Sequence, residues 1–412
     1  MYNKTVLTNG VRIISERIPY LKSVSIGIWV ASGSQDELKA TNGVSHFIEH
    51  MLFKGTHKRD GFQIAKEFDA IGGMWNAFTS RESTCFYARV LGKHLPIAAD
   101  ILSDIFLNPL FDKNDIEVER NVILQEIYMT EDTPDDVIHD IFYSTLWPDH
   151  ALGMPISGSR ETVSAIDVQT IKEYMKNYYI SPRILIVAAG DVNHDQLLDL
   201  FTPFFEKLPV YDDYPSVASP AKIKNISVRE KDLEQVHFCL GGNAPEQGSE
   251  DRFACAVLNT IWGGNMSSRL FQVIREQYGL SYSVFSFVSP YRNAGIIGMY
   301  AASEAENINL TLELSMTELN RLLNGDIKED EVSAARDYLT GSYQLSYESA
   351  ENRMMGLASN EFIFGRKISL DETLDKINRI TFDQVVFMAS SLFDQNNRSL
   401  AMLGPIKDDI LF

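Results

Sequence analysis

Apolar and polar residues follow two different periodicities along the chain. Short runs rich in β-branched and other apolar residues predict strands, two of them in each half of the sequence. These runs cover residues 23–31, 183–190, 234–242 and 398–404. Longer segments, such as residues 44–53 and 115–129, place apolar residues every three or four positions and therefore predict amphipathic helices. Since the strands occur in groups beside long helices, the pattern predicts an α+β fold with mostly antiparallel sheets flanked by helices.

The middle of the chain interrupts this pattern. Three prolines fall between residues 209 and 220, in a stretch without apolar periodicity. Proline fixes the backbone angle φ and donates no amide hydrogen, so such a stretch resists both a helix and a central strand. We therefore expect a linker at residues 209–222, between a first domain at residues 1–208 and a second at residues 223–412.

The two halves resemble each other in the order of their segments. Strand-like, helical and loop patterns of the first half recur at similar spacing in the second. The matching pairs are residues 23–31 with 234–242, 66–71 with 275–280, 111–120 with 327–336, and 183–190 with 398–404. The sustained order predicts two similar domains from an internal duplication, and a chance likeness of unrelated domains is the alternative.

Composition and charge exclude several classes of function. The 412 residues include 37 Lys and Arg against 56 Asp and Glu, which gives a formal net charge of −19. The sequence contains no run of basic residues that would indicate nucleic-acid binding. No apolar stretch approaches the roughly 18 residues of a membrane helix, and the N-terminus lacks the apolar core of a secretory signal. Cys85, Cys239 and Cys255 lie in apolar segments, as buried free thiols do in a reducing compartment. We therefore expect a soluble cytoplasmic protein that binds neither nucleic acid nor membrane.

The most specific motif is His46-Phe-Ile-Glu49-His50, in the first predicted helix. At about 100° per residue, its three polar side chains share one face, opposite the apolar face of the helix. Two imidazoles four residues apart can bind one tetrahedral ion, and a glutamate on their face could take a proton from water at that ion. The alternative is a solvated helix face with two incidental histidines.

A catalytic zinc site needs a third protein ligand and leaves a further position to water. In the helix predicted at residues 115–129, Glu119 and Glu126 share one stripe with two isoleucines. Carboxylates on an apolar stripe are costly unless they are paired, protonated or bound to metal. The spacing leaves open whether they bind metal or line a partly exposed face, with Glu119 paired to Arg120 or another cation.

These residues carry a resemblance to a known family. His46-Phe-Ile-Glu-His50, with Glu126 further along the chain, resembles the inverted motif of the pitrilysin-type zinc peptidases. The surrounding residues 43–56 are most similar to the β subunit of mitochondrial processing peptidase and its bacterial two-domain homologues. The likeness extends over essentially the whole chain.

The resemblance implies a zinc-dependent metalloendopeptidase with one Zn²⁺ per chain. Its metal ligands would be His46, His50 and Glu126. Glu49 would then be the general base, and Glu119 would orient a ligand histidine. The expected activity is hydrolysis of peptide bonds in unfolded or extended peptides, as in a processing peptidase. The rival is a non-catalytic scaffold or peptide-binding subunit of the same fold, although such a relative would be expected to lose zinc ligands or the base.

The resemblance also implies residues that bind substrate. Asn76, Ala77 and Phe78 lie in a segment similar to the strand on which the family binds extended peptides. Arg275 and Tyr282 match a pair in the family's second domain. Judged from the sequence without that resemblance, these two are a surface arginine and a half-buried core tyrosine.

The second half lacks the metal-binding residues of the first. The positions that correspond to the two histidines and the glutamate of the motif are occupied in the second half by Cys255, Leu258 and Asn259. We therefore expect an inactive C-terminal copy that contributes to substrate binding. Since one chain has one half of each kind, we also expect a homodimer in which Arg275 and Tyr282 of one subunit complete the zinc site of the other.

Overall fold

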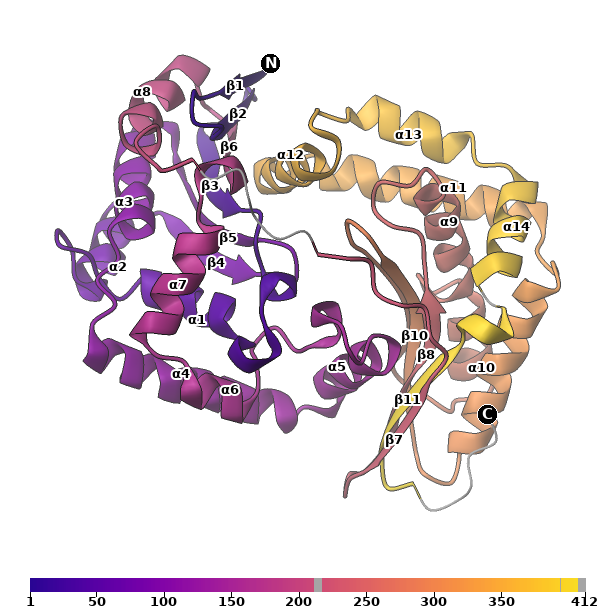
Figure 1. Ribbon diagram of the computed structural model, residues 1–412. Helices are drawn as coiled ribbons and strands as arrows, with labels where there is room; N and C mark the ends of the chain where they lie inside the picture. Colours follow the sequence, from indigo (N-terminus) through magenta and orange to yellow (C-terminus); the bar gives the residue numbers. More distant parts are fainter. Residues whose placement is uncertain (211–216, 393, 407–412) are drawn as a thin grey trace. The chain divides into compact units, whose positions relative to one another are not determined.

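Two sheets organise the chain in the computed structural model (Figure 1), which describes residues 1–210, 217–392 and 394–406. They belong to two units, each built from three separate segments of the sequence. The first unit comprises Met1–Tyr128, Met154–Val217 and Ser346–Lys367, and the second comprises Met129–Gly153, Ala218–Leu345 and Ile368–Phe412. Both units combine a sheet with helices, so the predicted α+β fold is confirmed.

The first sheet has an antiparallel framework with one parallel pair. Its strands follow the order β1 (Tyr2–Val6), β2 (Arg12–Arg17), β6 (Ile184–Gly190), β3 (Ser23–Val30), β5 (Thr84–Leu91) and β4 (Met74–Thr79). The pair β2–β6 is parallel, and the other neighbours are antiparallel. The apolar runs β3 and β6 lie at the centre, where both faces of a strand are covered, whereas β4 lies at an edge.

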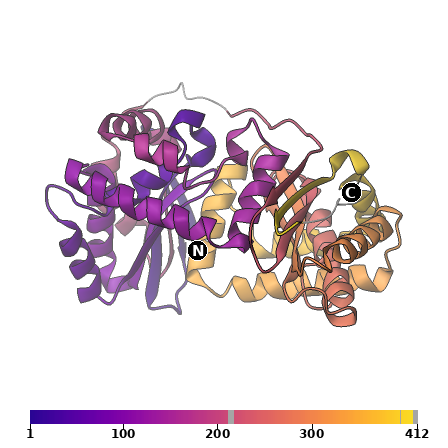
Figure 2. The ribbon, with the colours of Figure 1, turned by 90° about the horizontal axis from the view of Figure 1, so that it is seen from below.

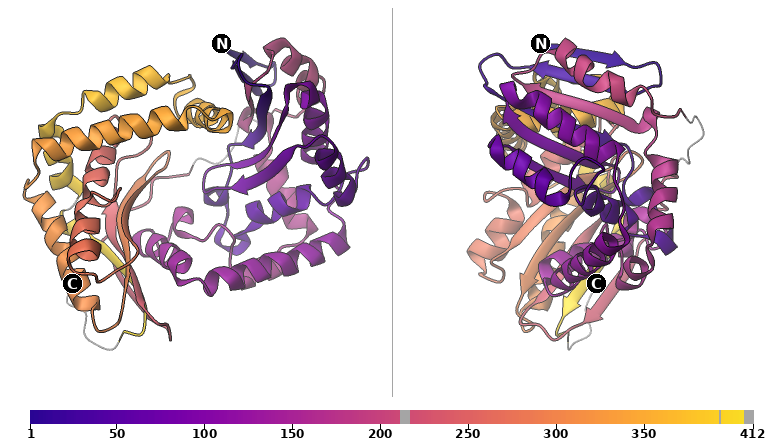
Figure 3. Two further views of the ribbon diagram at one scale, coloured as in Figure 1. Left: turned by 180° about the vertical axis from the view of Figure 1, so that it is seen from behind. Right: turned by 90° about the vertical axis from the view of Figure 1, so that its left-hand side faces the viewer.

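The second sheet repeats this arrangement. Its strands follow the order β7 (Ile226–Glu230), β11 (Ser399–Gly404), β8 (Val236–Asn243), β10 (Gly295–Ser303) and β9 (Val284–Pro290). The pair β7–β11 is parallel, and the other neighbours are antiparallel. This order matches β2–β6–β3–β5–β4 of the first sheet strand for strand, which supports the predicted duplication. Figure 2 and Figure 3 show the strands of each sheet side by side from other directions.

Helices cover both faces of each sheet. The helices formed by the first half are α1 (Val44–Leu52), α2 (Gly61–Ala70), α3 (Leu95–Leu107), α4 (Lys113–Glu131), α5 (Pro134–Leu146), α6 (Arg160–Ala165), α7 (Val168–Tyr178) and α8 (His194–Phe205). Those of the second half are α9 (Arg252–Trp262), a π-helix (Phe271–Gln277), α10 (Ile308–Leu323), α11 (Glu329–Ser346), α12 (Ala350–Phe364), α13 (Leu370–Asn378) and α14 (Phe382–Leu392). Along β6 the side chains alternate between two cores, with Ile186 in the larger core and Val187 in the core beneath α12.

The two halves of the chain exchange one helix each. Helix α5, from the first half, packs against β8 and β11 of the second sheet, whereas α12, from the second half, packs against β3 and β6 of the first (Figure 1). The predicted contiguous division into residues 1–208 and 223–412 therefore differs from the units of the structure. An apolar helix face shows that a helix is buried, but not which sheet buries it. The chain passes from the first unit to the second after Val217, within the predicted linker. Residues 211–216 of that linker lie outside the described part of the chain.

The three cysteines are buried and unpaired, as predicted. Among the described helices, none is both long and apolar enough to cross a lipid bilayer.

Candidate metal centre

Helix α1 presents the histidine motif. Its apolar side chains, including Phe47 and Ile48, are fully buried in the core of the first unit, which leaves His46, Glu49 and His50 on the other face. Gly43 starts the helix at φ 95°, and a Cβ atom there would lie 2.7 Å from the Ser157 carbonyl oxygen. Glycine is therefore required by both the left-handed backbone and the close approach.

Helix α4 brings Glu126 to the two histidines. Oε2 of Glu126 lies 3.6 Å from Nε2 of His46 and 3.5 Å from Nε2 of His50. One donor atom of each residue lies within 4.8 Å of the others. Ligands about 2.0 Å from a tetrahedral zinc ion are about 3.3 Å apart, so these three donors fit such an ion with little adjustment. Among the described residues, this is the one group of three or more donors of metal-binding type.

The protonation state of His46 favours metal binding. Burial, together with the neighbouring His50, lowers the pKa of His46 to about 4. The His46 imidazole is therefore neutral at physiological pH and has a lone pair available for a cation. Burial also disfavours the charged form of His50, but Glu119 and Glu126 outweigh it and raise its pKa.

Glu119 lies behind the cluster rather than in it. Its Oε2 is 3.0 Å from Nδ1 of His50, and its Oε1 pairs with the ammonium group of Lys54. Burial opposes ionisation of Glu119, but these two partners lower its pKa below the usual value. An anionic Glu119 that accepts a hydrogen bond from the Nδ1–H group leaves Nε2 of His50 free to face Glu126. Nδ1 of His46, in contrast, is buried without a hydrogen-bond partner in the described part of the chain.

Glu49 lies on the same helix face and is not one of the three clustered donors. Its Oε2 accepts a hydrogen bond of 2.5 Å from the hydroxyl of Thr79 on β4. Burial raises the pKa of Glu49, and the hydrogen bond from Thr79 opposes that effect. The carboxyl group is thus available for proton transfer beside the cluster.

A buried carboxylate binds the start of α1. Oε2 of Glu37 accepts from the backbone N–H of Gly43 at 2.7 Å and from the Asn42 amide at 2.9 Å, and Oε1 accepts from the backbone N–H of Ser45 at 2.8 Å. The two backbone groups are donors that a helix N-terminus leaves without intrahelical partners. Burial raises the pKa of Glu37 to about 7, although these hydrogen bonds lower it. Glu37 thereby fixes the end of the helix that carries both histidines.

The predicted substrate-binding residues Asn76, Ala77 and Phe78 lie on the edge strand β4. Their side chains alternate between the faces of the sheet. Ala77 packs against the core that contains α1, and Phe78 packs against the core beneath α12.

Arg275 and Tyr282 belong to the second unit. The guanidinium of Arg275 lies 4.5 Å from the centre of the Tyr282 ring, and it also covers the ring of Phe271 at 4.7 Å. Tyr282 is 82% exposed, so the alternative of a half-buried core tyrosine is wrong. The two residues form one cation–π pair, in which Tyr282 is exposed and Arg275 is partly buried.

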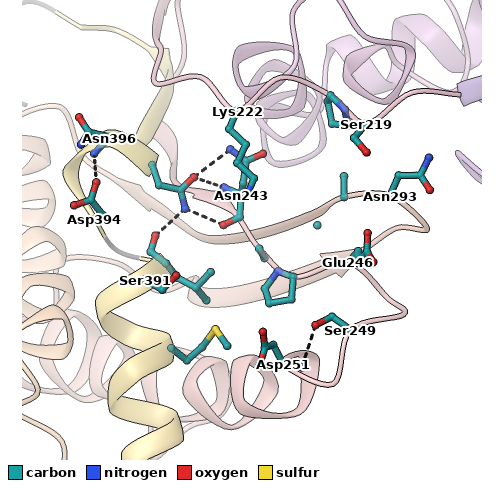
Figure 4. A pocket seen from close by; sticks show the side chains of 18 of the residues that line it. Ser219, Lys222, Asn243, Glu246, Ser249, Asp251, Asn293, Ser391, Asp394 and Asn396 are labelled. Atoms are coloured by element: carbon teal, nitrogen blue, oxygen red, sulfur yellow. Dashed lines mark hydrogen bonds between the residues drawn. The ribbon is translucent and has the colours of Figure 1, made fainter.

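The second unit also contains a cavity of about 850 Å³. Figure 4 shows its polar lining, which includes Lys222, Asn243, Glu246 and Asp251. None of these residues belongs to the metal-type donor group found in the described chain.

Sequence reasoning missed three side chains that organise the site: Glu37, Lys54 and Thr79. The partners of Lys54 and Thr79 are distant in sequence, and no periodic pattern marks any of the three. The segment containing Thr79 is expected from the sequence to bind peptide, but the contact of Thr79 with Glu49 is not. The alternative that Glu119 pairs with Arg120 or another cation is confirmed in its second form, because Glu119 pairs with Lys54 while Arg120 binds Glu117.

Known proteins resemble the chain over both halves. Residues 12–160 match the family described as Insulinase (Peptidase family M16), and residues 165–339 match the Peptidase M16 inactive domain. A Bacillus subtilis (strain 168) protein named "Uncharacterized zinc protease YmxG" is 37% identical over 405 residues, which cover 98% of both chains. An "Uncharacterized zinc protease" of Rickettsia felis is 35% identical over 406 residues, again 98% of both.

Solved structures share the fold at lower identity. A protease from Helicobacter pylori superposes with a TM-score of 0.90 over 98% of this chain and 99% of its own, at 19% identity. A Pseudomonas fluorescens structure described as a peptidase M16 inactive domain gives a TM-score of 0.91 over 100% of both chains, also at 19% identity. The histidine motif lies inside the first family match, and the second match contains no such motif. From these two matches, the chain belongs to peptidase family M16.

Proposed function

We propose that the protein is a zinc-dependent endopeptidase that cleaves unfolded or extended peptides, in the manner of a processing peptidase. The observation that carries the proposal is the cluster of His46, His50 and Glu126, with Glu49 beside it on the same helix face. The names of the relatives as zinc proteases support the choice of metal and reaction. The three free, buried thiols support action in a reducing compartment, for which we propose the cytoplasm.

The chemistry divides between the metal and Glu49. Zinc bound by the cluster would supply a Lewis acid that polarises the scissile carbonyl and acidifies the attacking water. Glu49 would take a proton from that water and deliver it to the leaving amine. Burial raises the pKa of Glu49, which makes its carboxylate a stronger base. Glu119 would hold His50 in the tautomer that binds metal.

The substrate would bind as an added strand. Strand β4 pairs with β5 on one side and ends the sheet on the other. The backbone of Asn76, Ala77 and Phe78 would form ladder hydrogen bonds with an extended peptide. Since these bonds recognise the main chain, the enzyme would accept many peptide sequences but not a folded protein.

We further propose a homodimer, in which Arg275 and Tyr282 of one subunit act on substrate bound at the zinc site of the other. The motivating feature is the division of residues between the halves. The second half has Cys255, Leu258 and Asn259 at the motif positions but carries the arginine–tyrosine cation–π pair. A two-fold pairing would join both kinds of half at each site.

A peptide assay tests the proposed function against its rival, a non-catalytic peptide-binding subunit. The purified protein is incubated with unstructured fluorogenic peptides, with and without a zinc chelator, and then resupplied with zinc. We expect hydrolysis that the chelator abolishes and zinc restores. Peptide binding without hydrolysis in the zinc-loaded protein would instead establish the rival.

A further inference from the structure

The hydroxyl of Thr79 donates a hydrogen bond to Oε2 of Glu49, with 2.5 Å between the two oxygen atoms. Thr79 is the last residue of β4, and its backbone is paired with Thr84 of β5. The donor is therefore delivered by a strand within the sheet rather than by a free loop. The position of the Thr79 hydroxyl relative to α1 depends on the packing of β4 against that helix.

The alternation of side chains along β4 explains why Thr79 meets Glu49. Trp75 and Ala77 point to the core of the first unit, where the apolar face of α1 also packs. Thr79 is the next residue on that face, since strand side chains repeat every second position. At this position the sequence has a hydroxyl in place of a purely apolar side chain, and that hydroxyl reaches the carboxylate.

Glu49 depends on this contact for its orientation. Within the described residues, the hydroxyl of Thr79 supplies the side-chain hydrogen bond to Glu49. A glutamate side chain has three rotatable bonds, so without an anchor its carboxylate occupies several rotamers. A charge-assisted hydrogen bond to a hydroxyl on a packed strand selects one of them.

We propose that Thr79 is a positioning residue for Glu49, holding its carboxylate in the rotamer from which it exchanges protons with water and the leaving amine. This inference rests on the proposed function and deepens it. The strand that anchors the base is the same strand whose edge would bind the peptide. A peptide added to β4 and the base would then share one rigid support, which keeps the scissile bond and Glu49 in register.

The test compares two substitutions at Thr79 in the zinc-loaded full chain. Thr79→Val keeps the shape of the side chain and removes the hydroxyl, whereas Thr79→Ser keeps the hydroxyl. We expect kcat of Thr79→Val to fall about 10- to 100-fold, as expected for losing a hydrogen bond to a charged group, with KM nearly unchanged. Thr79→Ser should recover most of kcat. Zinc affinity, measured by chelator competition, should stay the same in both variants, because Thr79 contacts none of the three clustered donors.

The matched control is Thr84→Val, the same change at the residue paired with Thr79. The Thr84 hydroxyl donates to the Ser32 carbonyl at 3.0 Å and does not reach Glu49. We expect this variant to lower the melting temperature while kcat per folded protein stays unchanged. An equal loss of kcat in Thr79→Val and Thr79→Ser, or in Thr79→Val and Thr84→Val, would overturn the positioning role.

Crystal structures give a readout that does not depend on activity. In Thr79→Val the Glu49 carboxylate should move by about 1 Å or more, a displacement large enough to impair catalysis, and in Thr79→Ser it should stay in place. If the Glu49 carboxylate of Thr79→Val does not move, the inference is overturned, whatever the activity of that variant. If the wild-type protein instead shows no chelator-sensitive hydrolysis, the proposed function fails, and the movement of Glu49 still decides whether Thr79 positions it.

Discussion

Nδ1 of His50 lies 3.0 Å from Oε2 of Glu119, whose other oxygen pairs with Lys54. This contact joins the helix of the histidine motif to α4, the helix that also carries Glu126. It fixes the orientation of one imidazole from behind, so that the nitrogen on its other side faces the metal cluster. The metal-binding geometry therefore depends on a residue that does not itself reach the cluster.

Replacing Glu119 by glutamine should weaken zinc binding without removing a ligand. The amide cannot provide a negative charge to both His50 and Lys54, and we expect the affinity for zinc to fall about 10- to 100-fold. Chelator competition measures this change. Glu117→Gln is the matched control, because Glu117 is an exposed residue of the same helix that pairs with Arg120. Equal affinities of the two variants would contradict the role of Glu119.

The ligand assignment predicts zinc content. The purified protein should contain about one zinc ion per chain, since three protein ligands and one water complete a catalytic site. His46→Ala and Glu126→Gln should each lower that content sharply, whereas His57→Ala, at an exposed histidine, should leave it unchanged. Elemental analysis after dialysis provides the measurement. Full zinc occupancy in Glu126→Gln would exclude Glu126 as a ligand.

Glu49→Gln should separate catalysis from metal binding. Because Glu49 is outside the cluster, the variant should keep its zinc and its melting temperature. Loss of the general base should reduce kcat by about 10²- to 10⁴-fold. Activity near that of the wild type would rule out this role, and loss of zinc would show that Glu49 is a ligand.

Glu37 should make stability depend on pH. Its carboxyl ionises near 4.5 in the unfolded chain and near 7 in the folded one, so the folded state holds a proton that the unfolded state releases between these values. This contribution to stability is present below pH 4.5 and is lost as the pH rises to about 7, by roughly 3 kcal/mol. Melting temperatures of the wild type and Glu37→Gln, measured from pH 5 to 8, should show a steeper decline in the wild type. Parallel curves would contradict this assignment.

Mixing two inactive proteins tests the shared site. Glu49→Gln subunits are combined with Tyr282→Phe subunits under conditions that allow exchange. If Tyr282 acts across the interface, each heterodimer has one site with both defects and one with neither, and should recover about half the wild-type activity. If it acts within its own chain, every site keeps one defect and mixing restores nothing. Fluorescence transfer between labelled subunits controls for exchange, and an active monomer would also refute the shared site.

The sequence by itself determined the features that depend on local geometry. The spacing of His46, Glu49 and His50 places them on one helix face wherever that helix packs, because the helical repeat is set by the backbone. The order of apolar runs likewise predicted the α+β fold and the repeated sheet, since each run must bury its apolar face. Periodicity also placed Glu119 and Glu126 on one stripe of α4, but it left their roles open.

Only the tertiary structure decided which residues meet across elements. It shows that Glu126 reaches both histidines while Glu119 lies behind one of them, a difference set by the packing of α4 against α1. It also shows that α5 and α12 are exchanged between the sheets, and that Thr79 reaches Glu49. Such contacts join residues far apart in sequence, and they depend on the distances and directions that core packing imposes. Helix and strand periodicity determine which face a residue occupies, whereas packing determines its partner.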